Sequence, residues 1–379
     1  MLGQVEASRA EANKANKAIA ESHGEDRAAA IAGAKQKSQG LQDIESQLRV
    51  LREKLDSILL DVPNLVHPEA PPGVGDESNQ ILRESGDIPS FDFTPKDHLA
   101  LGEYLDIIDV ERAGKVSGSR FAFLKRDGAL LELALQRFVI ERLAPAGFIP
   151  VIPPVLVKRD AMVGTGFFPT DETQVYRIEA DDLYLAGTSE VPIASMHAGE
   201  TIKAADLPLR YLGVSSCFRR EAGTHGRDTR GIIRLHQFQK IEMFSFCRAD
   251  HSQKEHAALV GFEEDLFSAL QIPYRVVEIC AGDLASPNYR KYDLEAWLPG
   301  SERWLEVTSC SNDIDYQARR LSVRTKSDAG TEFVHTLNGT GIAFPRAIVA
   351  LLENHQRADG SIEIPDALKP FTGFDVIKT

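Results

Sequence analysis

The first 62 residues constrain the fold of this chain more than any other feature. They contain no proline before Pro63, and their only ring side chain is His23. Ala, Glu, Lys, Gln and Arg dominate the segment, as they do in long helices. The stretch SHGEDR, from Ser22 to Arg27, is the one clear break. The pattern therefore predicts two helices joined by a tight turn.

The second of these helices carries an apolar seam with heptad spacing. A single amphipathic helix packed on a globular core would show the same pattern. Because the segment has no other apolar face, an antiparallel helical hairpin that forms a two-helix coiled coil is the favoured interpretation. The seam residues recur at alternating spacings of three and four: Leu41, Ile44, Leu48, Leu51, Leu55 and Ile58.

The rest of the chain has a mixed pattern. The Pro- and Gly-rich run from Asp61 to Asn79 ends the helical segment, and residues 63–94 are expected to form a linker. Beyond it, short alternating strands are predicted, with helices at about 129–148, 251–270 and 345–356. Such an order is typical of an α+β domain built on an antiparallel sheet, here spanning 95–379.

Two negative observations narrow the fold further. The chain has no GxxxxGK[ST] loop and no GxGxxG run after a predicted strand, so the common parallel-sheet nucleotide folds lack their fingerprints. The apolar segment 149–157 is interrupted by prolines. Proline removes a backbone donor, so this segment is expected at a sheet edge or an interface.

Composition bounds the partners and the compartment. The net charge of -13 makes the chain a poor general binder of nucleic acid, so any such partner must be contacted by local patches. No run of about 18 apolar residues and no secretory signal are present, and the cytoplasm is the expected compartment. Reduced thiols, without disulfides or zinc, are expected because the four cysteines stand far apart: Cys217, Cys247, Cys280 and Cys310.

The stretch from Cys217 to Phe246 concentrates charge in an ordered way. Its thirty residues hold six Lys/Arg and three Asp/Glu, with apolar residues between them. The order predicts two strands joined by a Gly-rich hairpin loop. Because side chains alternate across a strand, one face should carry two guanidiniums, a ring and two carboxylates. These are Arg219, Glu221, Arg234, Phe238 and Glu242.

That face suits a nucleotide. A guanidinium binds two phosphate oxygens at once, a ring stacks on a purine, and a carboxylate accepts from an amine. From the alternation of side chains alone, a half-buried hairpin with ordinary surface charge pairs explains these residues equally well. The opposite face is expected to pack inward through Ile233, Leu235, Ile241 and Met243.

The whole stretch resembles motif 2 of the class II aminoacyl-tRNA synthetases, in the form found in the seryl-tRNA synthetase family. TSEVP (188–192) resembles that family's serine-binding loop, and LEVTSCSN (305–312) resembles its metal- and nucleotide-binding strand. TLNGTGIAFPRAIVALLENHQ (336–356) resembles motif 3, and 129–157 resembles motif 1. With motif 2 at about 213–246, the resemblance implies a class II catalytic domain over 95–379. It also implies a tRNA-binding helical arm over 1–62.

The resemblance implies ATP-dependent ligation of L-serine to serine tRNA through a seryl adenylate, and serylation of selenocysteine tRNA as well. ATP and Mg²⁺ are the implied cofactors. Arg219 would contact the α-phosphate and the serine carboxylate, and Arg346 the γ-phosphate; both count as catalytic. The implied ATP-binding residues are Arg219, Arg220, Glu221, Leu235, Phe238, Glu306, Val307, Thr308, Ser309 and Arg346.

The same resemblance implies the other partners. Glu306 and Ser309 would hold Mg²⁺ between the phosphates, and a homodimer would form through motif 1. The implied serine-binding residues are Thr188, Ser189, Glu190, Arg219, Glu242, Asn338 and Thr340. The implied tRNA contacts on the arm are Lys14, Lys17, Arg27, Lys35 and Lys37.

Three departures from the family pattern stand out. Family arms have a fuller first helix, so the first helix here is expected to be truncated and part of the seam uncovered. Pro345 replaces the common glycine before the motif 3 arginine, which suits the first turn of a helix. The run SNDI (311–314) lacks a cysteine often found there.

Two rival functions remain open at this point. One is a serine-activating paralogue with a non-tRNA acceptor or a self-protection role, against which the retained arm argues. The other is a catalytically inactive RNA-binding relative. The presence of Arg219, Glu221, Glu306 and Arg346 argues against that alternative.

Overall fold

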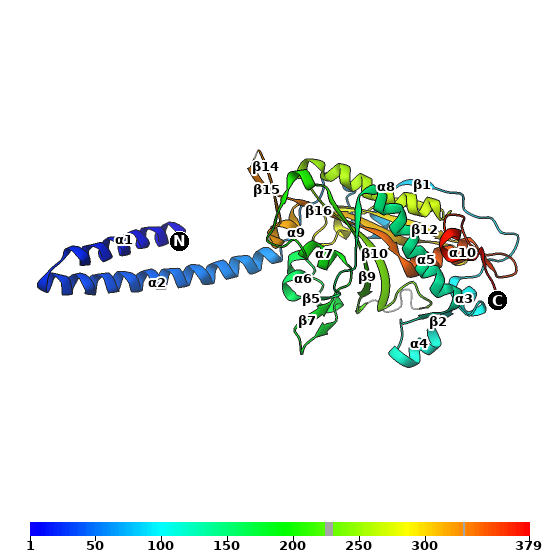
Figure 1. Ribbon diagram of the computed structural model, residues 1–379, viewed down its shortest axis with the longest axis horizontal. Coiled ribbons are helices and arrows are strands. Elements are labelled where there is room, and N and C mark those ends of the chain that lie inside the picture. The colour runs from blue at the N-terminus through cyan, green and yellow to red at the C-terminus, as the bar shows by residue number, and fades with distance from the viewer. Residues whose placement is uncertain (224–229, 329) are drawn as a thin grey trace. The chain divides into compact units, whose positions relative to one another are not determined.

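The computed structural model describes residues 1–223, 230–328 and 330–379 (Figure 1). The chain separates into two compact units, Met1–Val62 and Pro63–Thr379. Among the described residues, no helix is both long enough and apolar enough to cross a membrane.

The first unit is a hairpin of two antiparallel helices, α1 (Leu2–Glu21) and α2 (Gly24–Leu60) (Figure 1). The break lies inside the predicted turn, so the helical hairpin predicted from the sequence is confirmed. An ion pair between Arg9 and Glu45, with 2.7 Å between nitrogen and oxygen, joins the two helices far from the turn. Both side chains are partly exposed, so the pair adds little stability of its own.

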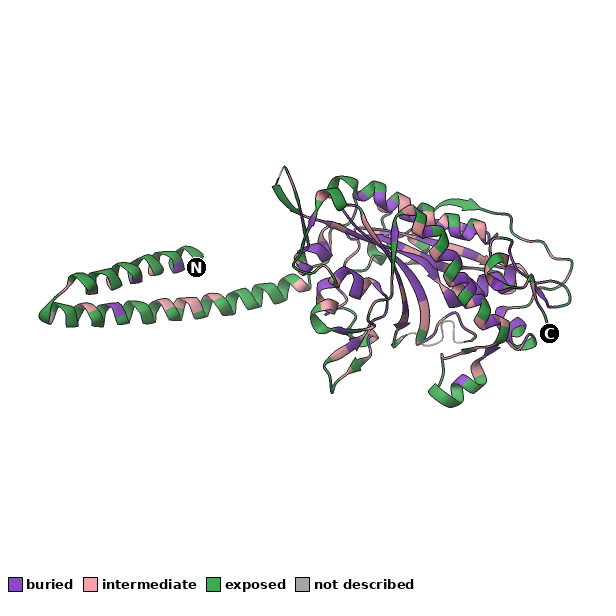
Figure 2. Cartoon of the chain, in the orientation of Figure 1, coloured by how far each residue is buried: buried purple, intermediate pink, exposed green. Residues whose placement is uncertain are grey.

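The apolar seam on α2 is only partly covered. Its first half is half-buried, whereas Leu51, Leu55 and Ile58 are each about half exposed. Figure 2 shows the same change, because residues 49–59, in the last part of α2, are all exposed. The uncovered seam expected from the sequence is therefore present in this unit.

The second unit is built on an eight-stranded sheet. The strand order is β1-β11-β12-β13-β16-β10-β9-β4, and every pairing is antiparallel except that of β4 with β9. The α+β class with an antiparallel sheet is thus confirmed. The strands are β1 (Gln80–Ser85), β4 (Phe148–Val151), β9 (Leu209–Phe218), β10 (Gln237–Cys247), β11 (Tyr274–Glu278), β12 (Arg290–Leu298), β13 (Arg303–Asn312) and β16 (His335–Ala343).

Helices pack against this sheet and enclose the core (Figures 1 and 2). The main apolar cluster is formed by side chains of α5, α8, α10 and the inner strands. The longer helices lie where the sequence predicts them. The helices of this unit are α3 (His98–Tyr104), α4 (Val110–Ser117), α5 (Arg126–Leu143), α6 (Arg159–Thr165), α7 (Glu190–Ser195), α8 (Ser252–Ala269), α9 (Tyr316–Leu321), α10 (Phe344–Asn354) and α11 (Lys369–Thr372).

Short strands form small additional sheets at the periphery. They hold the loops around the main sheet. Most of them were not predicted, because a strand of two to four residues is too short to show a clear alternation in the sequence. They are β2 (Ile108–Asp109), β3 (Phe123–Leu124), β5 (Leu156–Lys158), β6 (Arg177–Ile178), β7 (Leu183–Leu185), β8 (Thr201–Lys203), β14 (Arg324–Ser327), β15 (Gly330–Phe333), β17 (Ile362–Glu363) and β18 (Val376–Ile377).

The hairpin of the charged stretch is shorter than predicted. β9 ends at Phe218 and β10 begins at Gln237, so Arg219, Glu221 and Arg234 lie beyond the strands. The alternation rule does not apply to them, and the expectation that they share a strand face was wrong. Residues 224–229 of the predicted Gly-rich loop lie outside the described residues.

The segment expected to be a linker is not irregular throughout. Gln80–Ser85 forms β1, which pairs with β11 at one edge of the main sheet. Upstream of it, the Asn64 side-chain amide donates to the backbone carbonyls of Pro287 and Asp313, at 2.8 and 2.9 Å. Much of 63–94 is therefore tied to the second unit.

Gly213 in β9 permits close packing against the residues that begin at the TSEVP run. A Cβ atom on Gly213 would lie 2.4 Å from Ile193 Cδ1 and 2.5 Å from Ser189 Oγ. Ser189 belongs to the TSEVP run (188–192), and Ile193, on α7, comes directly after that run. A substitution at Gly213 therefore presses directly on that run.

We predict that Gly213→Ala lowers the free energy of unfolding by about 1–3 kcal/mol, because overpacking displaces the neighbouring side chains. Gly261→Ala on α8 is the matched control, since a Cβ there meets nothing within 4 Å. It should raise the free energy by about 0.5–1 kcal/mol through helix propensity. Urea unfolding of both variants gives the comparison, and equal effects would contradict the packing argument.

Candidate active site

One cavity of about 390 Å³ gathers most of the residues implied by the resemblance. It lies over the strands β10, β13 and β16 and is closed by the start of α10 and by loops around Gly166, Asp171 and Pro287. The implied residues that line it are Thr188, Glu190, Arg219, Glu221, Leu235, Phe238, Glu306, Val307, Thr308, Ser309, Asn338, Thr340 and Arg346.

Arg219 and Phe238 form one wall of the cavity. The Arg219 guanidinium carbon lies 5.3 Å from the centre of the Phe238 ring, and its Nε donates to the carbonyl of Gly187 at 3.3 Å. Phe238 is on β10, and the position paired with it on β9 is Cys217. A flat ring and a guanidinium side by side can receive the base and the phosphate of one nucleotide.

Glu221 and Arg234 face each other in the loops beyond the ends of β9 and β10. Arg234 Nη1 lies 2.5 Å from Glu221 Oε2. Glu221 has a backbone φ of 50°, in the left-handed region that residues with a Cβ seldom adopt. Within the described part of the chain, the buried Nε of Arg234 has no hydrogen-bond partner. The pair therefore presents a carboxylate at a fixed angle together with an unused donor.

Glu306 and Arg346 pair at another wall. Arg346 Nη1 lies 3.1 Å from Glu306 Oε1 and donates to the Glu306 carbonyl at 2.7 Å. Burial raises the pKa of Glu306, but the charges of Arg346 and Lys291 outweigh burial, so the net direction is down. Glu306 is thus an ionised carboxylate beside two cations. Pro345, at the first turn of α10, presents Arg346 as the sequence predicted.

A second carboxylate lies behind this wall on β12. Asp293 contacts Lys291 at 3.2 Å, and its Oδ1 is buried without a hydrogen-bond partner among the described residues. Burial raises the pKa of Asp293 to about 7, against the opposing charge of Lys291. β12 pairs with β13, and Asp293 is directly opposite Ser309 in that register.

The opposite end of the cavity is a polar pocket on β10 and β16. Thr188 Oγ1 donates to Glu242 Oε2 at 3.1 Å, and Lys240 forms an ion pair with the same carboxylate. Glu242 is opposite Thr340 in the β10–β16 register. Burial raises the pKa of Glu242, while Lys240 acts in the other direction.

Glu190 completes this pocket at the start of α7. Its Oε1 accepts a hydrogen bond from Gln317 Nε2 at 2.7 Å. Burial, reinforced by the charge of Glu242, raises the pKa of Glu190 to about 7. On β16, Asn338 donates to Asp313 at 3.3 Å. The buried Glu242, the half-buried Glu190 and several fixed hydrogen-bonding groups therefore converge on a small volume.

Comparisons with known proteins agree on the family. A model described as "Seryl-tRNA synthetase N-terminal domain" matches residues 1–66, and "tRNA synthetase class II core domain (G, H, P, S and T)" matches 174–355. "Serine--tRNA ligase" of Thermobifida fusca is 49% identical over 377 residues, which are 99% of this chain and 89% of that protein. The chain belongs to the seryl-tRNA synthetase family. It is therefore a class II aminoacyl-tRNA synthetase, as the sequence resemblance indicated.

Solved structures of seryl-tRNA synthetases have the same fold. The Pyrococcus horikoshii enzyme complexed with ATP has a TM-score of 0.93 at 42% identity, covering 99% of this chain and 90% of that one. The Naegleria fowleri cytoplasmic enzyme in complex with AMP has a TM-score of 0.88 at 31% identity, with the same coverage. Prolyl-tRNA synthetase of Giardia lamblia, at 16% identity and a TM-score of 0.63, shares the fold alone.

Three residues implied by the seryl-tRNA synthetase resemblance do not line the cavity. The exposed Arg220 uses its backbone N–H to donate to the Gln174 carbonyl at 2.8 Å. Ser189 is buried and donates to the carbonyl of Gly213. Glu242 is buried, and its carboxylate contacts Thr188 and Lys240, which do line the cavity.

Sequence reasoning missed several polar side chains that line the cavity. Lys240 could have been predicted, because it lies between Phe238 and Glu242 and has the same strand parity. Lys291 could not have been predicted, because its position depends on the pairing of β12 with β13. The missed lining residues with charged or amide side chains are Asp171, Lys240, Asn288 and Lys291.

The cavity suits a hard cation held jointly with a ligand. Within the described residues, no group of three or more His, Cys, Asp or Glu side chains is arranged to hold a metal. Glu306 and Ser309 both line the cavity and offer a carboxylate and a hydroxyl, which are oxygen ligands that Mg²⁺ prefers. Two protein oxygens fit the usual pattern in which substrate phosphates and water supply the remaining ligands.

We predict that Glu190→Gln changes the pH dependence of stability. The pKa of folded Glu190 is about 7, above its ordinary value of 4.5, so the unfolded chain loses this proton first as pH rises. Stability from this group therefore falls between about pH 4.5 and pH 7. Urea unfolding should show the variant gaining more, relative to the original protein, at pH 8 than at pH 5. An equal difference at both pH values would contradict the assignment.

Proposed function

We propose that this chain activates L-serine with ATP to form seryl adenylate and transfers the seryl group to serine tRNA. The observation that carries the proposal is a single cavity. Arg219, Phe238 and Arg346 line one end, and Thr188, Glu190 and Thr340 line the other, where Thr188 is hydrogen-bonded to Glu242. The names of the relatives, serine--tRNA ligases, and the ATP complex of a structural neighbour support it. The cytoplasm is the proposed compartment.

At the nucleotide end, Phe238 receives the adenine and Glu221 accepts from its amino group. Arg219 binds the α-phosphate and Arg346 the γ-phosphate. The serine carboxylate attacks the α-phosphorus, its oxygen forms the new bond, and pyrophosphate leaves. Such a displacement depends on positioning and on stabilising developing charge, which two guanidiniums at fixed places supply. Mg²⁺ held by Glu306 and Ser309 would neutralise phosphate charge.

At the serine end, two carboxylates have different tasks. Glu190 receives the ammonium group of serine, and Glu242 with Thr340 receives the side-chain hydroxyl. Alanine would leave those buried acceptors and donors without a partner, which costs more than the lost contact. Asn338 and Thr188 hold the neighbouring groups in place through their own hydrogen bonds.

We propose that residues 1–62 bind the tRNA and that the catalytic domain comprises 95–379. The arm is a helical hairpin, which recognises RNA by shape and phosphate contact more readily than by base reading. Its proposed contact residues all have exposed side chains: Lys14, Lys17, Arg27, Lys35 and Lys37. Selenocysteine tRNA is proposed as a second acceptor for the same activity.

A homodimer is proposed through motif 1. β4 is the edge strand of the main sheet, and Ile149 and Ile152 on or after it are 47% and 85% exposed. On α5, Leu130 and Leu133 are also exposed. Exposed apolar side chains beside an open strand edge suit an interface. Light scattering that reports a mass near 41.7 kDa at micromolar concentration would overturn this proposal.

Serine-dependent ATP–pyrophosphate exchange tests the adenylation step. We expect exchange with serine and much less with alanine or threonine. Arg219→Ala and Arg346→Ala should each lower the rate on the order of 10²–10³, because each removes a donor to developing charge. Arg220→Ala is the control, since Arg220 does not line the cavity. ATP–pyrophosphate exchange that is as fast with alanine as with serine would contradict the proposal.

Charging of serine tRNA tests the arm separately. Replacing Lys14, Lys17 and Arg27 with alanine should raise the KM for tRNA and leave ATP–pyrophosphate exchange unchanged, because adenylation uses only the cavity. Selenocysteine tRNA can be assayed in the same way. Adenylation without any charging of tRNA would instead favour a paralogue with another acceptor.

A further inference from the structure

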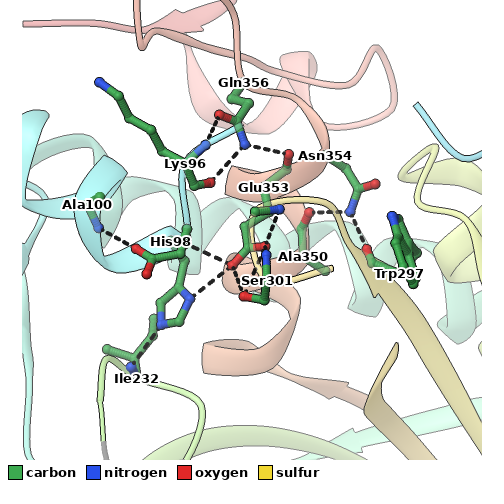
Figure 3. A network of polar contacts seen from close by, with 12 residues as sticks. Lys96, His98, Ala100, Ile232, Trp297, Ser301, Ala350, Glu353, Asn354 and Gln356 are labelled. Atoms are coloured by element: carbon green, nitrogen blue, oxygen red, sulfur yellow. Dashed lines mark hydrogen bonds and ion pairs between the residues drawn. The ribbon is translucent and has the colours of Figure 1, made fainter. Parts of the chain in front are cut away.

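Glu353, near the C-terminal end of α10, is a fully buried carboxylate at a junction of three chain segments (Figure 3). Its Oε2 accepts from the backbone N–H groups of Gly300 and Ser301, at 3.0 and 3.2 Å. Its Oε1 accepts from the Ser301 hydroxyl at 3.2 Å and from the His98 backbone N–H at 3.1 Å. A carboxylate with this many donors is held as an acceptor only.

His98, the first residue of α3, extends this junction with its ring (Figure 3). Its Nδ1 lies 3.1 Å from Glu353 Oε1, and its Nε2 lies 3.4 Å from the backbone nitrogen of Ile232. Since Glu353 only accepts, Nδ1 carries the proton. Since the Ile232 N–H only donates, Nε2 must offer a lone pair. Both contacts are satisfied by one neutral tautomer, with the proton on Nδ1.

The segment held by His98 Nε2 is part of the cavity wall. Ile232, Ile233, Arg234 and Leu235 all line the cavity, and the two isoleucines are buried. Gly231 has a φ of 74°, and a Cβ there would lie 2.0 Å from His98 Nε2. The backbone thus passes against the imidazole ring at the point where it enters the site.

We propose that His98 is a positioning residue for the nucleotide end of the active site. Through its two ring nitrogens it ties the segment 231–235 to Glu353, and Glu353 is on the helix that begins beside Arg346. The segment in turn places Arg234 against Glu221. His98 does not line the cavity and contacts no implied substrate group. This inference rests on the proposed function.

The bond to Ile232 and the bond to Glu353 can be separated by two substitutions. An asparagine amide nitrogen takes the place of Nδ1, so His98→Asn keeps a donor to Glu353 and loses the acceptor for Ile232. A glutamine amide oxygen reaches the place of Nε2, so His98→Gln keeps the acceptor for Ile232 and loses the donor to Glu353. In both variants the backbone N–H of residue 98 still anchors it to Glu353. A positioning role therefore depends most directly on the Ile232 bond, whereas a role in packing α3 on α10 depends on the side-chain bond to Glu353.

We expect His98→Asn to raise the KM for ATP in serine-dependent exchange by about three- to ten-fold, the loss expected for one hydrogen bond. His98→Gln should raise it less. The KM for serine should change little in either, because none of the proposed serine-binding residues belongs to the segment 231–235. Ser301→Ala, which removes a hydroxyl from Glu353 without touching Ile232, is the control and should leave the KM for ATP unchanged. A larger rise in His98→Gln than in His98→Asn would overturn the proposal.

A readout without catalysis separates this inference from the proposed function. Hydrogen exchange of the Ile232 amide, followed by NMR in protein labelled at isoleucine, should be faster in His98→Asn than in His98→Gln. Faster exchange without serine-dependent ATP turnover would support the junction and refute the function. If His98→Asn does not fold, Gly231→Ala breaks the same contact from the other side and should raise the KM for ATP. An unchanged Ile232 amide and KM for ATP in these variants would refute the positioning role.

Discussion

The pairing of β10 on both edges is the constraint on which the site depends. Antiparallel ladders to β9 and β16 fix this strand in register, so its alternate side chains must face the cavity. Phe238, Lys240 and Glu242 therefore follow one another along one face of β10, from the proposed nucleotide end to the proposed serine end. The same pairing puts Thr340 opposite Glu242. The opposite face of the strand, with Ile241 and Met243, is fully buried.

The charges in the cavity are arranged as close pairs. Arg234 with Glu221, Arg346 with Glu306, and Lys240 with Glu242 each place a cation against a carboxylate. Removing either partner would leave a partly buried charge without compensation, which is expensive. In the proposed function, a bound nucleotide and amino acid would exchange these pairings for contacts with phosphate, amine and hydroxyl groups. A site of this kind is ready for charged ligands and stays intact without them.

Outside the cavity, the buried polar contacts hold its walls together. Glu353 joins α10 to the β12–β13 turn through Gly300 and Ser301, and β13 carries Glu306. His98 accepts a hydrogen bond from the backbone of Ile232 and so joins the segment 231–235, which leads into β10, to the same network. A fully satisfied buried network of this type favours one arrangement of the segments that meet there. The geometry of the nucleotide end is therefore set partly by residues that never reach it.

The sequence by itself determined the helical hairpin, the α+β class and the long helices. Most of the ATP- and serine-binding residues that the motif resemblance implied also line the cavity. Periodicity suffices for such elements because it is local. It failed for Arg219, Glu221 and Arg234, whose places depend on loops beyond the strand ends. Periodicity also missed Lys291, because the order of strands in a sheet cannot be predicted from a local sequence pattern. The tautomer of His98 and the raised pKa of Glu190 were decided by tertiary structure alone, since both arise from groups far apart in the chain.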